Sequence, residues 1–300
     1  MNLSVVIATH NRSDDLEDCI RSLLRMKRQP LEIIAVDSSS LDNTRKLAET
    51  YPIQYISIRE ENRQRARNIG LSKSKGDIVA FIDDDVVVDQ DWCTNLLISY
   101  SDTRIGGVGG RVIPFGAPID RLSKIKRSET GKVYADGLIL GNFDVVLPSL
   151  TEVDHLAGCN MSFRKDLLIK LGGFDENFIG SGFRDDTDTS LRIKKAGYKL
   201  IYQSKALVWH KFLGRVFDEK WTYWYVRNSI YFYFKNISPP SGFYFPQFLL
   251  RLILIPQGYI KKSRVSVKPT CPIFLAAVRG MVEGLLLSRT KRRLFDRFHN

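Results

Sequence analysis

Three consecutive aspartates, Asp83, Asp84 and Asp85, follow the apolar run 78–82 and are the residues of this chain best suited to chemistry. Adjacent carboxylates repel one another, so such a cluster is expected in water or around cations. Alternate side chains of an extended segment share a face, which would point Asp83 and Asp85 the same way. Two hard oxygen ligands at the end of a buried strand suit Mg²⁺ or Mn²⁺. The alternative is a solvated turn that caps the next helix.

Apolar runs of strand length alternate with helical patterns through the first half of the chain. The predicted strands are 3–8, 31–36, 53–58, 77–82 and 107–113, and the predicted helices are 14–25, a short one from about 42, 64–73 and 89–101. Ser13 is placed to cap the first helix. The alternation predicts an α/β fold with a mostly parallel sheet flanked by helices. Ligands of such folds gather beyond the carboxyl ends of the strands, where Thr9, Asp37 and the aspartate triplet are expected.

The second half is less regular. Residues 114–155 are rich in Gly, Pro and isolated charges, and we expect a loop-rich insertion that shapes an acceptor pocket. A strand at 158–163, a helix at 165–171 and a helix from Asp185 to about 196 are predicted to follow.

The composition is that of an ordinary globular protein. With 300 residues, 44% of them hydrophobic, the chain can form one large α/β domain or a domain with an appendage. The four cysteines are widely spaced without a CxxC pair, which indicates a reducing compartment and argues against a disulfide framework or a zinc site. The first residues, Met1–Ile7, lack a basic region and a cleavage site, so they predict a strand and not a signal peptide. A cytoplasmic location is expected.

The net charge of +12 belongs to the last third of the chain. Residues 201–300 hold 17 Lys and Arg against 4 Asp and Glu, a balance of +13, while the first 200 residues have a balance of −1. Two interrupted apolar segments, 243–259 and 271–287, fall short of a transmembrane span. With basic neighbours at 261–264 and 289–293, they predict helices on the anionic inner face of the cell membrane. The alternative is a helical appendage packed on the catalytic domain or a second subunit; nucleic-acid binding ranks below both.

Several motifs of the chain resemble those of the family 2 glycosyltransferases, which have the GT-A fold. They follow the family's order over residues 3–235: Ser4–Arg12, Asn68–Gly70, Gly76–Asp85, Gly158–Met161, Gly173–Glu176, Asp185–Asp188 and Leu191-Arg192. The resemblance implies a Rossmann-like GT-A catalytic domain that moves a single sugar from a nucleotide-sugar to an acceptor hydroxyl. It also implies a divalent metal ion, inversion by single displacement, and a role in cell-surface glycan or glycolipid synthesis with a sugar or lipid-linked acceptor.

On the donor side, the resemblance implies that Asp37 contacts the base or ribose of the nucleotide. The loop beside it contributes Thr9, Asn11 and Arg12. The family usually has another Asp and a Gly after this aspartate, where the chain has Ser38 and Ser39, so the nucleotide contacts and the donor are left open.

The triplet corresponds to the metal-binding D-x-D motif of the family. A divalent ion held by Asp85, with Asp83 nearby, would stabilise the charge that grows on the leaving nucleoside diphosphate. Either Asp83 or Asp84 binds a ribose hydroxyl in the alternative assignment. In some members of the family a histidine at the position of His210 completes the metal site, and a neutral imidazole suits Mn²⁺. A merely hydrogen-bonded histidine is the other interpretation. Arg67 is the preferred diphosphate partner among Arg63, Arg65 and Arg67, which alternatively form a solvated helix face.

The acidic cluster Asp185–Asp188 stands where the family has its E-D motif, with Asp185 in place of the commoner Glu. By motif position Asp186 is the predicted general base that removes the proton of the acceptor hydroxyl. Carboxylates in the first turn of a helix are also stabilised by its dipole, and both roles can hold together. The remaining candidates for the acceptor or the diphosphate are Asn160, Asp185 and Arg227, the last with a core or interface role as the alternative.

The predicted organisation is a catalytic domain at 1–235, with a nucleotide half at 1–113 and an acceptor half at 114–235, and a helical basic tail at 236–300. The chain has no Q-x-x-R-W motif, so the processive membrane synthases of the family are a poor match. A sugar-phosphate nucleotidyltransferase is a second possible class, although the first loop lacks the glycines those enzymes carry. A non-catalytic sugar-binding scaffold is disfavoured because the metal, base and nucleotide positions are all carboxylates.

Overall fold

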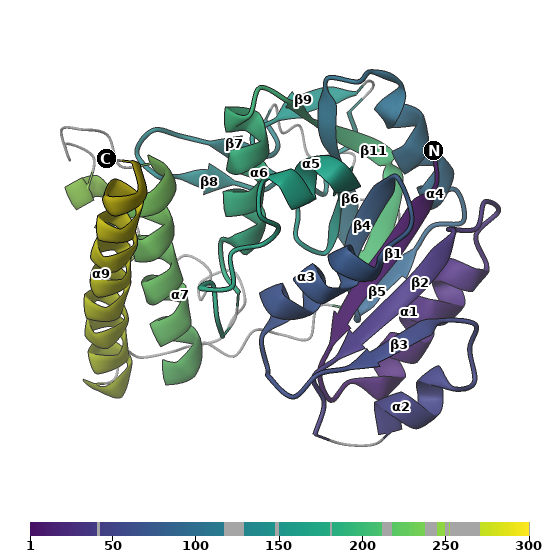
Figure 1. The fold of residues 1–300 in the computed structure, drawn as a ribbon, viewed down its shortest axis with the longest axis horizontal. Helices are drawn as coiled ribbons and strands as arrows, with labels where there is room; N and C mark the ends of the chain where they lie inside the picture. Colours follow the sequence, from purple (N-terminus) through teal and green to yellow (C-terminus); the bar gives the residue numbers. More distant parts are fainter. Residues whose placement is uncertain are drawn as a thin grey trace. The chain divides into compact units, whose positions relative to one another are not determined.

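The computed structural model describes most of the chain. The described residues are 1–40, 43–116, 129–147, 150–180, 182–211, 218–237, 245–249, 252 and 271–299, and in the last helix the side chains of 274–290. The chain folds into two compact units (Figure 1). Unit 1 comprises 1–132, 140–177 and 185–213, and unit 2 comprises 133–139, 178–184 and 214–300.

Unit 1 is built on a nine-stranded sheet, whose main path has the order β3-β2-β1-β4-β10-β6-β11-β5, with β9 paired to β11. The strands are β1 (Leu3–Thr9), β2 (Glu32–Asp37), β3 (Gln54–Ser57), β4 (Ile78–Asp83), β5 (Val86–Val88), β6 (Ile105–Pro114), β9 (Thr151–Val153), β10 (Asn160–Arg164) and β11 (Lys199–His210). Strands β3, β2, β1, β4, β6 and β11 run in one direction, and β10, β5 and β9 run in the other. The predicted mostly parallel sheet is confirmed.

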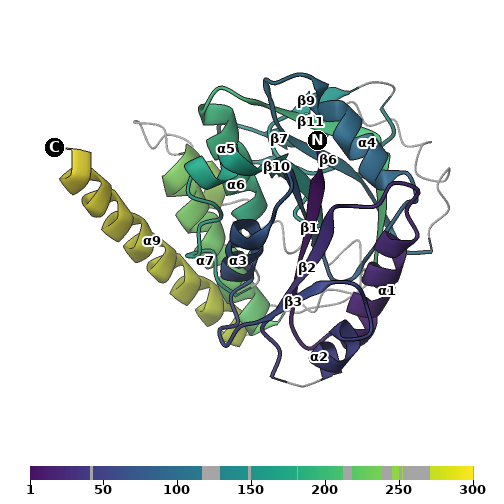
Figure 2. The ribbon, with the colours of Figure 1, turned by 45° about the vertical axis from the view of Figure 1, so that its right-hand side comes forward.

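Helices cover both faces of this sheet (Figure 2). They are α1 (Ser13–Leu24), α2 (Asn43–Ala48), α3 (Arg63–Lys73), α4 (Trp92–Ile98), α5 (Lys165–Lys170) and α6 (Asp185–Lys195). Alternation along β1 sends Val5 and Ile7 into one core with α1 and α4, and Val6 into the other core with α3, α5 and α6. Burial on both faces explains why these strands appear as continuous apolar runs in the sequence.

The predicted elements of unit 1 are present with small differences in their bounds, and one expectation, the cap of the first helix, was wrong. Ser13 does not cap the first helix: it is already in the helix, Arg12 holds the cap position, and no side-chain cap bond is formed. The described part of the segment 114–155 is mostly loop and contains three short strands, β7 (Lys132–Val133), β8 (Ile139–Leu140) and β9. These strands are two or three residues long, too short for a periodic pattern to reveal them.

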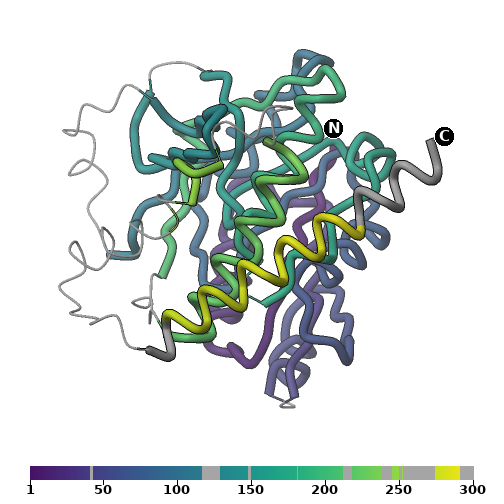
Figure 3. Tube along the Cα trace, turned by 90° about the vertical axis from the view of Figure 1, so that its left-hand side faces the viewer, coloured from purple at the N-terminus to yellow at the C-terminus, as the bar shows by residue number. Residues whose placement is uncertain are grey.

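Unit 2 has its own small core around two helices, α7 (Glu219–Phe232) and α9 (Cys271–His299), with a π-helical turn at Tyr233–Ile237. Figure 3 shows α9 running across α7. No described helix is both long and apolar enough to cross a membrane. The predicted tail helix at 243–259 lies largely outside the described residues, and the one at 271–287 is part of α9. The division into domains at residue 235 stays a prediction.

Candidate active site

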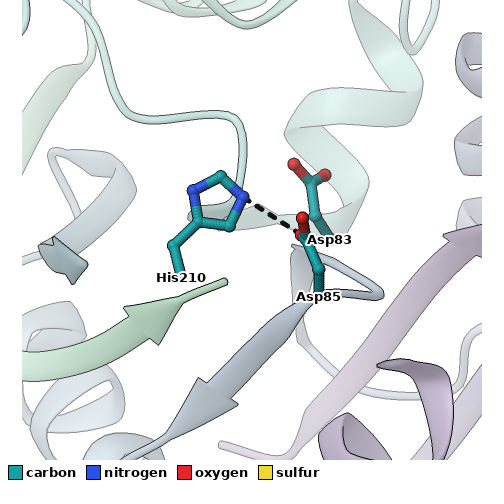
Figure 4. Close-up of side chains that lie close together, drawn as sticks. All are labelled: Asp83, Asp85 and His210. Carbon is teal, nitrogen blue, oxygen red and sulfur yellow. Dashed lines mark ion pairs between the residues drawn. The ribbon is translucent and has the colours of Figure 1, made fainter. Parts of the chain in front are cut away.

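The candidate metal ligands meet because two distant segments pair in the sheet. Strand β4 ends at Asp83, and Asp85 lies in the turn that leads into β5. Strand β5 pairs with the end of β11, where Val86 faces His210. One ligand atom each from Asp83, Asp85 and His210 lies within 4.8 Å of the others (Figure 4). The side chains converge through this turn and not through the extended geometry that we expected.

The donor set fits a small divalent cation. The Asp85 Oδ1 atom lies 3.0 Å from the His210 Nε2 atom. Adjacent ligands of an octahedral ion at about 2.1 Å are about 3 Å apart, so one ion can contact both atoms with little movement. Two carboxylates and one imidazole are donors that Mn²⁺ and Mg²⁺ sites use. In the described parts of the chain this is the one cluster of its kind.

The two buried aspartates of the triplet differ in their electrostatics. Burial raises the pKa of Asp85, but the hydrogen bond and charge of His210, together with Arg12, outweigh it and lower the pKa below its usual value. Burial raises the pKa of Asp84 to about 7, against the opposing effects of Arg12 and Thr9. Asp85 is therefore ionised and suited to bind a cation, whereas Asp84 is held by protein donors.

Arg12 places a positive charge against two carboxylates of the triplet. Its guanidinium contacts Asp84 Oδ1 and Asp85 Oδ2, each at 3.0 Å, and Asp15 Oδ2 at 2.9 Å. The other oxygen of Asp15 accepts a hydrogen bond of 3.1 Å from Lys211, the residue after His210. Asp15 thus ties the start of α1 to the end of β11, on either side of the candidate metal ligands.

Arg67 is a second bridge, and it is buried with a side-chain exposure of 1%. It contacts Asp83 Oδ1 at 3.1 Å and Asp185 Oδ2 at 2.6 Å, and it donates to the carbonyl oxygen of Gly158 at 2.9 Å. Gln64 donates to the same oxygen of Asp185 at 3.0 Å. The guanidinium predicted to bind a diphosphate therefore joins the metal side of the site to the start of α6.

Asp186, the predicted base, is fixed by backbone donors. Its Oδ2 atom accepts from the Gly158 N–H at 3.1 Å and its Oδ1 atom from the Thr187 N–H at 2.7 Å. A Cβ atom on Gly158 would lie 3.1 Å from Asp186 Oδ2, so the glycine allows this close approach. The Thr187 hydroxyl also donates to Oδ1, at 3.1 Å, so the second lone pair of Oδ2 is the one left for an acceptor hydroxyl. The two roles considered for this residue, helix start and base, are compatible.

The nucleotide-side residues form a polar group at the ends of β1 and β2 that is joined to the triplet through Thr9. Asp37 is 1% exposed and accepts hydrogen bonds from the Tyr55 hydroxyl and the Ser39 N–H, both at 2.8 Å. The backbone N–H of Asn11, whose φ is 53°, donates to Ser39 Oγ at 2.7 Å. Thr9 donates to Asp84 Oδ2 at 2.8 Å. The strand ends thus bring the predicted donor residues to one edge of the sheet.

Two of the remaining candidates have partners within the fold. Asn160 is fully buried, donates to the carbonyl oxygens of Ala206 and Arg111 at 3.0 and 3.2 Å, and accepts from the Trp92 indole. Arg227 belongs to unit 2, where its Nε atom lies 3.0 Å from Glu283 Oε1. These contacts favour the core role considered for Arg227 and give Asn160 a structural role that the sequence did not predict.

The sequence interpretation did not single out Asp15, Gln64 or Lys211. Asp15 looked like an ordinary acidic residue of a helix start, and Lys211 follows His210 directly. The position of Lys211 next to the candidate ligand His210 was the one signal in the sequence that could have identified it. The pairing of β5 with β11, which brings Lys211 to α1, connects residues more than a hundred positions apart and has no local pattern.

Comparison with known proteins supplies the class of this enzyme. The family model "Glycosyl transferase family 2" matches residues 4–172, more than half of the chain, and a model for the N-terminal domain of galactosyltransferase matches 149–209. The chain therefore belongs to glycosyl transferase family 2, and it is a glycosyltransferase. A nucleotidyltransferase and a non-catalytic scaffold are not supported.

The curated relatives are similar over about 70% of the chain. A glucosyl-dolichyl phosphate glucuronosyltransferase of Haloferax volcanii is 28% identical over 228 residues, which cover 70% of this chain and 69% of the relative. The succinoglycan biosynthesis protein ExoM of Rhizobium meliloti is 27% identical, with 69% and 66% covered. A poly-β-1,6-N-acetyl-D-glucosamine synthase of Staphylococcus aureus is 26% identical over 69% of this chain, which spans only 49% of that protein.

Solved structures confirm the GT-A fold. The mannosyltransferase PcManGT of Pyrobaculum calidifontis, solved with GDP-Man and Mn²⁺, has a TM-score of 0.58 at 18% identity, with 96% of this chain and 86% of that chain covered. GalNAc-T7, solved with UDP, GalNAc and Mn²⁺, has a TM-score of 0.57 at 18% identity, with 90% and 59% covered. At such identities the likeness concerns the fold alone.

Proposed function

We propose that this enzyme transfers a single sugar from a nucleotide-sugar to an acceptor hydroxyl, with Mn²⁺ or Mg²⁺ as cofactor and with inversion at the sugar. The observation that carries the proposal is the convergence of Asp83, Asp85 and His210 within 4.8 Å. Through Arg67 and Gly158, this cluster is joined to the candidate base Asp186. A metal site, a donor edge and a base then lie in one compact unit.

The metal ligands and their neighbours serve the leaving group. A divalent ion held by Asp83, Asp85 and His210 supplies Lewis-acid stabilisation of the diphosphate. His210 and Arg12 lower the pKa of Asp85, and Arg12 orients this carboxylate through the 3.0 Å contact to Oδ2. Asp37 and the loop from Thr9 to Arg12 are the proposed contacts of the nucleoside, by their position at the same strand ends.

Asp186 serves the acceptor. Its carboxylate takes the hydroxyl proton while the acceptor oxygen forms a bond to the anomeric carbon. The bond from that carbon to the diphosphate oxygen breaks, and its electron pair leaves with the nucleoside diphosphate. Attack from the face opposite the leaving group inverts the configuration. The backbone N–H groups of Gly158 and Thr187 fix the carboxylate, which reduces the reorganisation needed for proton transfer.

The pathway is proposed from the relatives. Two of them are named for polysaccharide synthesis and one for a dolichyl phosphate substrate. We propose that this enzyme also acts in cell-surface glycan or glycolipid synthesis, on a sugar or lipid-linked acceptor. A cytoplasmic enzyme that works peripherally at the anionic inner face of the cell membrane would meet both substrates.

The test measures donor turnover by the full-length protein with UDP-, GDP- and dTDP-sugars, with Mn²⁺ and after chelation. We expect metal-dependent release of the nucleoside diphosphate, reduced by about 100-fold or more in Asp85→Ala and Asp186→Ala. The residual turnover of Asp85→Ala is expected to be independent of Mn²⁺, whereas Asp186→Ala is expected to retain metal and donor binding.

Asp102→Asn is the matched control, because Asp102 lies at the surface beside Arg104 and away from the site residues. It should turn over like the wild type. Full turnover by Asp85→Ala or Asp186→Ala would contradict the assigned roles, and equal rates with and without the metal would contradict the cofactor.

A further inference from the structure

Helix α9 buries its two glycines and exposes five of its large apolar residues. Gly280 and Gly284 are both buried against α7. A Cβ atom at Gly280 would lie 2.6 Å from the Tyr223 carbonyl oxygen, and one at Gly284 would lie 2.7 Å from the Arg227 carbonyl oxygen. The two helices therefore approach backbone to backbone, as helices with small residues four positions apart do. This contact uses one face of α9 and leaves the opposite face outward.

The outward face carries an apolar stripe. Val278, Val282 and Leu286 repeat every four residues, with exposures of 40, 52 and 58%, and Phe274 and Leu275 extend the stripe with 67 and 60%. Residues at this spacing line one side of a helix. These five account for five of the twelve large hydrophobic side chains that are strongly exposed in the described parts of the chain. A gathering of this kind on one helix marks an interaction surface.

Positive charge accompanies this stripe. Arg279 and Arg289 are exposed on the same helix, and the helix continues through Lys291, Arg292 and Arg293 in sequence. Glu283, the one acidic residue between 271 and 290, is engaged by Arg227 on α7. Residues 201–300 as a whole are also positively charged, with a balance of +13. A partner must therefore offer an apolar layer bordered by negative charge.

We propose that the outward face of α9, defined by Phe274, Leu275, Val278, Val282 and Leu286, docks the enzyme onto an anionic lipid bilayer. Apolar side chains enter the boundary between headgroups and acyl chains, while arginines contact the lipid phosphates. The inference deepens the proposed function, because it identifies the surface by which the enzyme reaches a lipid-linked acceptor. It does not depend on the metal site.

A bilayer accounts for the features better than a second copy of the chain does. A symmetric dimer through this face would place the positive charges of Arg279 and Arg289 from both copies in one interface, and like charges at an interface oppose association. Anionic headgroups instead provide opposite charge at the depth where the arginine side chains end. The oligomeric state is accordingly an outcome of the test.

The experiment is flotation of the full-length protein with vesicles of phosphatidylcholine alone and of phosphatidylcholine with phosphatidylglycerol. We expect flotation only with phosphatidylglycerol, weakened by salt because exposed charges are screened. Val282→Asp with Leu286→Asp should lower the bound fraction by about tenfold or more. Arg279→Gln with Arg289→Gln, which keeps the apolar stripe, should lower it less and remove most of the salt dependence.

Ile98→Asp with Ile169→Asp is the matched control, since both residues are exposed apolar side chains of unit 1, at 66 and 48%. This variant should float like the wild type. Unchanged flotation of the α9 variants, loss in the control, or a dimer in light scattering that only the α9 variants abolish would overturn the proposal. Donor turnover in solution, measured on the same proteins, should be unaffected. This second measurement distinguishes a failure of the docking proposal from a failure of the proposed function.

Discussion

At the scale of residues, the site is held by two arginines that each bridge several carboxylates. Arg12 joins Asp84, Asp85 and Asp15, and Arg67 joins Asp83 to Asp185. Without these cations the clustered carboxylates would repel one another and take up protons. The arginines therefore preorganise the site for a ligand. Residues that orient the arginines affect ligand binding indirectly.

Asp15 is the clearest case of such an indirect role. Asp15→Asn removes the charge that holds both Arg12 and Lys211. We expect an apparent Mn²⁺ affinity about threefold to tenfold weaker, less than the loss for a direct partner of a ligand. The maximal rate at saturating metal should change little. The measurement is turnover as a function of Mn²⁺ concentration.

Asp14→Asn is the matched control, with the same change of charge in the same helical turn but an exposed side chain. It should retain the metal response of the wild type. Equal metal responses of both variants would show that Asp15 does not position the site.

Arg67 combines a structural and a catalytic consequence. Arg67→Gln leaves Asp83 and Asp185 without their shared cation in a buried place, and removing one partner of a buried ion pair destabilises by about 3–5 kcal/mol. We expect a large fall in the free energy of unfolding measured by urea denaturation, together with loss of turnover. A role on the diphosphate alone would instead leave the stability unchanged.

Arg65→Gln tests the specificity of that effect on the same helix. Arg65 is 48% exposed in its side chain and pairs with the exposed Glu60. Exposed pairs contribute about 0–1 kcal/mol, so this variant should unfold nearly like the wild type. Equal destabilisation by both changes would contradict the distinction.

At the scale of elements, α9 can pack closely against α7 because Gly280 and Gly284 have no side chains at the contact. Replacing Gly with Ala inside a helix normally stabilises it by about 1 kcal/mol. Gly284→Ala should do the opposite, because the new Cβ atom would lie 2.7 Å from a backbone oxygen of α7 and 2.9 Å from the Ile230 Cβ atom. We expect a net destabilisation of about 1–3 kcal/mol in thermal unfolding followed by circular dichroism.

Thr290→Ala is the control at an exposed position of the same helix. It should be neutral or slightly stabilising, because alanine has the higher helix propensity. A stabilising Gly284→Ala would mean that α9 does not pack closely against α7.

The elements of unit 1 were largely predictable, and their pairings were not. Strands buried on both faces, such as β1 and β4, appear in the sequence as apolar runs whose ends could be placed within a residue or two. The metal cluster depends on β5, only three residues long, pairing with the end of β11. Such long-range register follows from the packing of the whole sheet, and no local pattern encodes it.

The residue types of the site could be predicted because they depend on local sequence, whereas their contacts could not, because they join residues far apart in the chain. Asp83, Asp85 and His210 each follow an apolar run, which a sequence shows directly. The partners of Arg67 lie far along the chain, at Asp185 and Gly158, so a solvated helix face could not be distinguished from a buried bridge. Both faces of α9 contain apolar residues, so only the structure distinguishes its packed face from its exposed one.

At the scale of the whole molecule, the proposed chemistry is confined to unit 1 and the proposed docking surface to unit 2. Each unit has a hydrophobic core of its own. A ligand of the active site should therefore stabilise the protein through unit 1, by binding the folded state only.

This linkage gives the last prediction. A nucleoside diphosphate with Mn²⁺ should raise the unfolding temperature more than either component alone, because the anion and the cation each complete the other's site. At a ligand concentration 100 times the dissociation constant, the gain is about 2.7 kcal/mol. Comparing UDP, GDP and dTDP in the same thermal scan identifies the base that the edge at Asp37 accepts. In Asp85→Ala the Mn²⁺-dependent part should vanish while any metal-independent nucleotide shift persists. A nucleotide shift that is the same with Mn²⁺ and with chelator in the wild type would show that the Asp83, Asp85 and His210 cluster does not take part in donor binding.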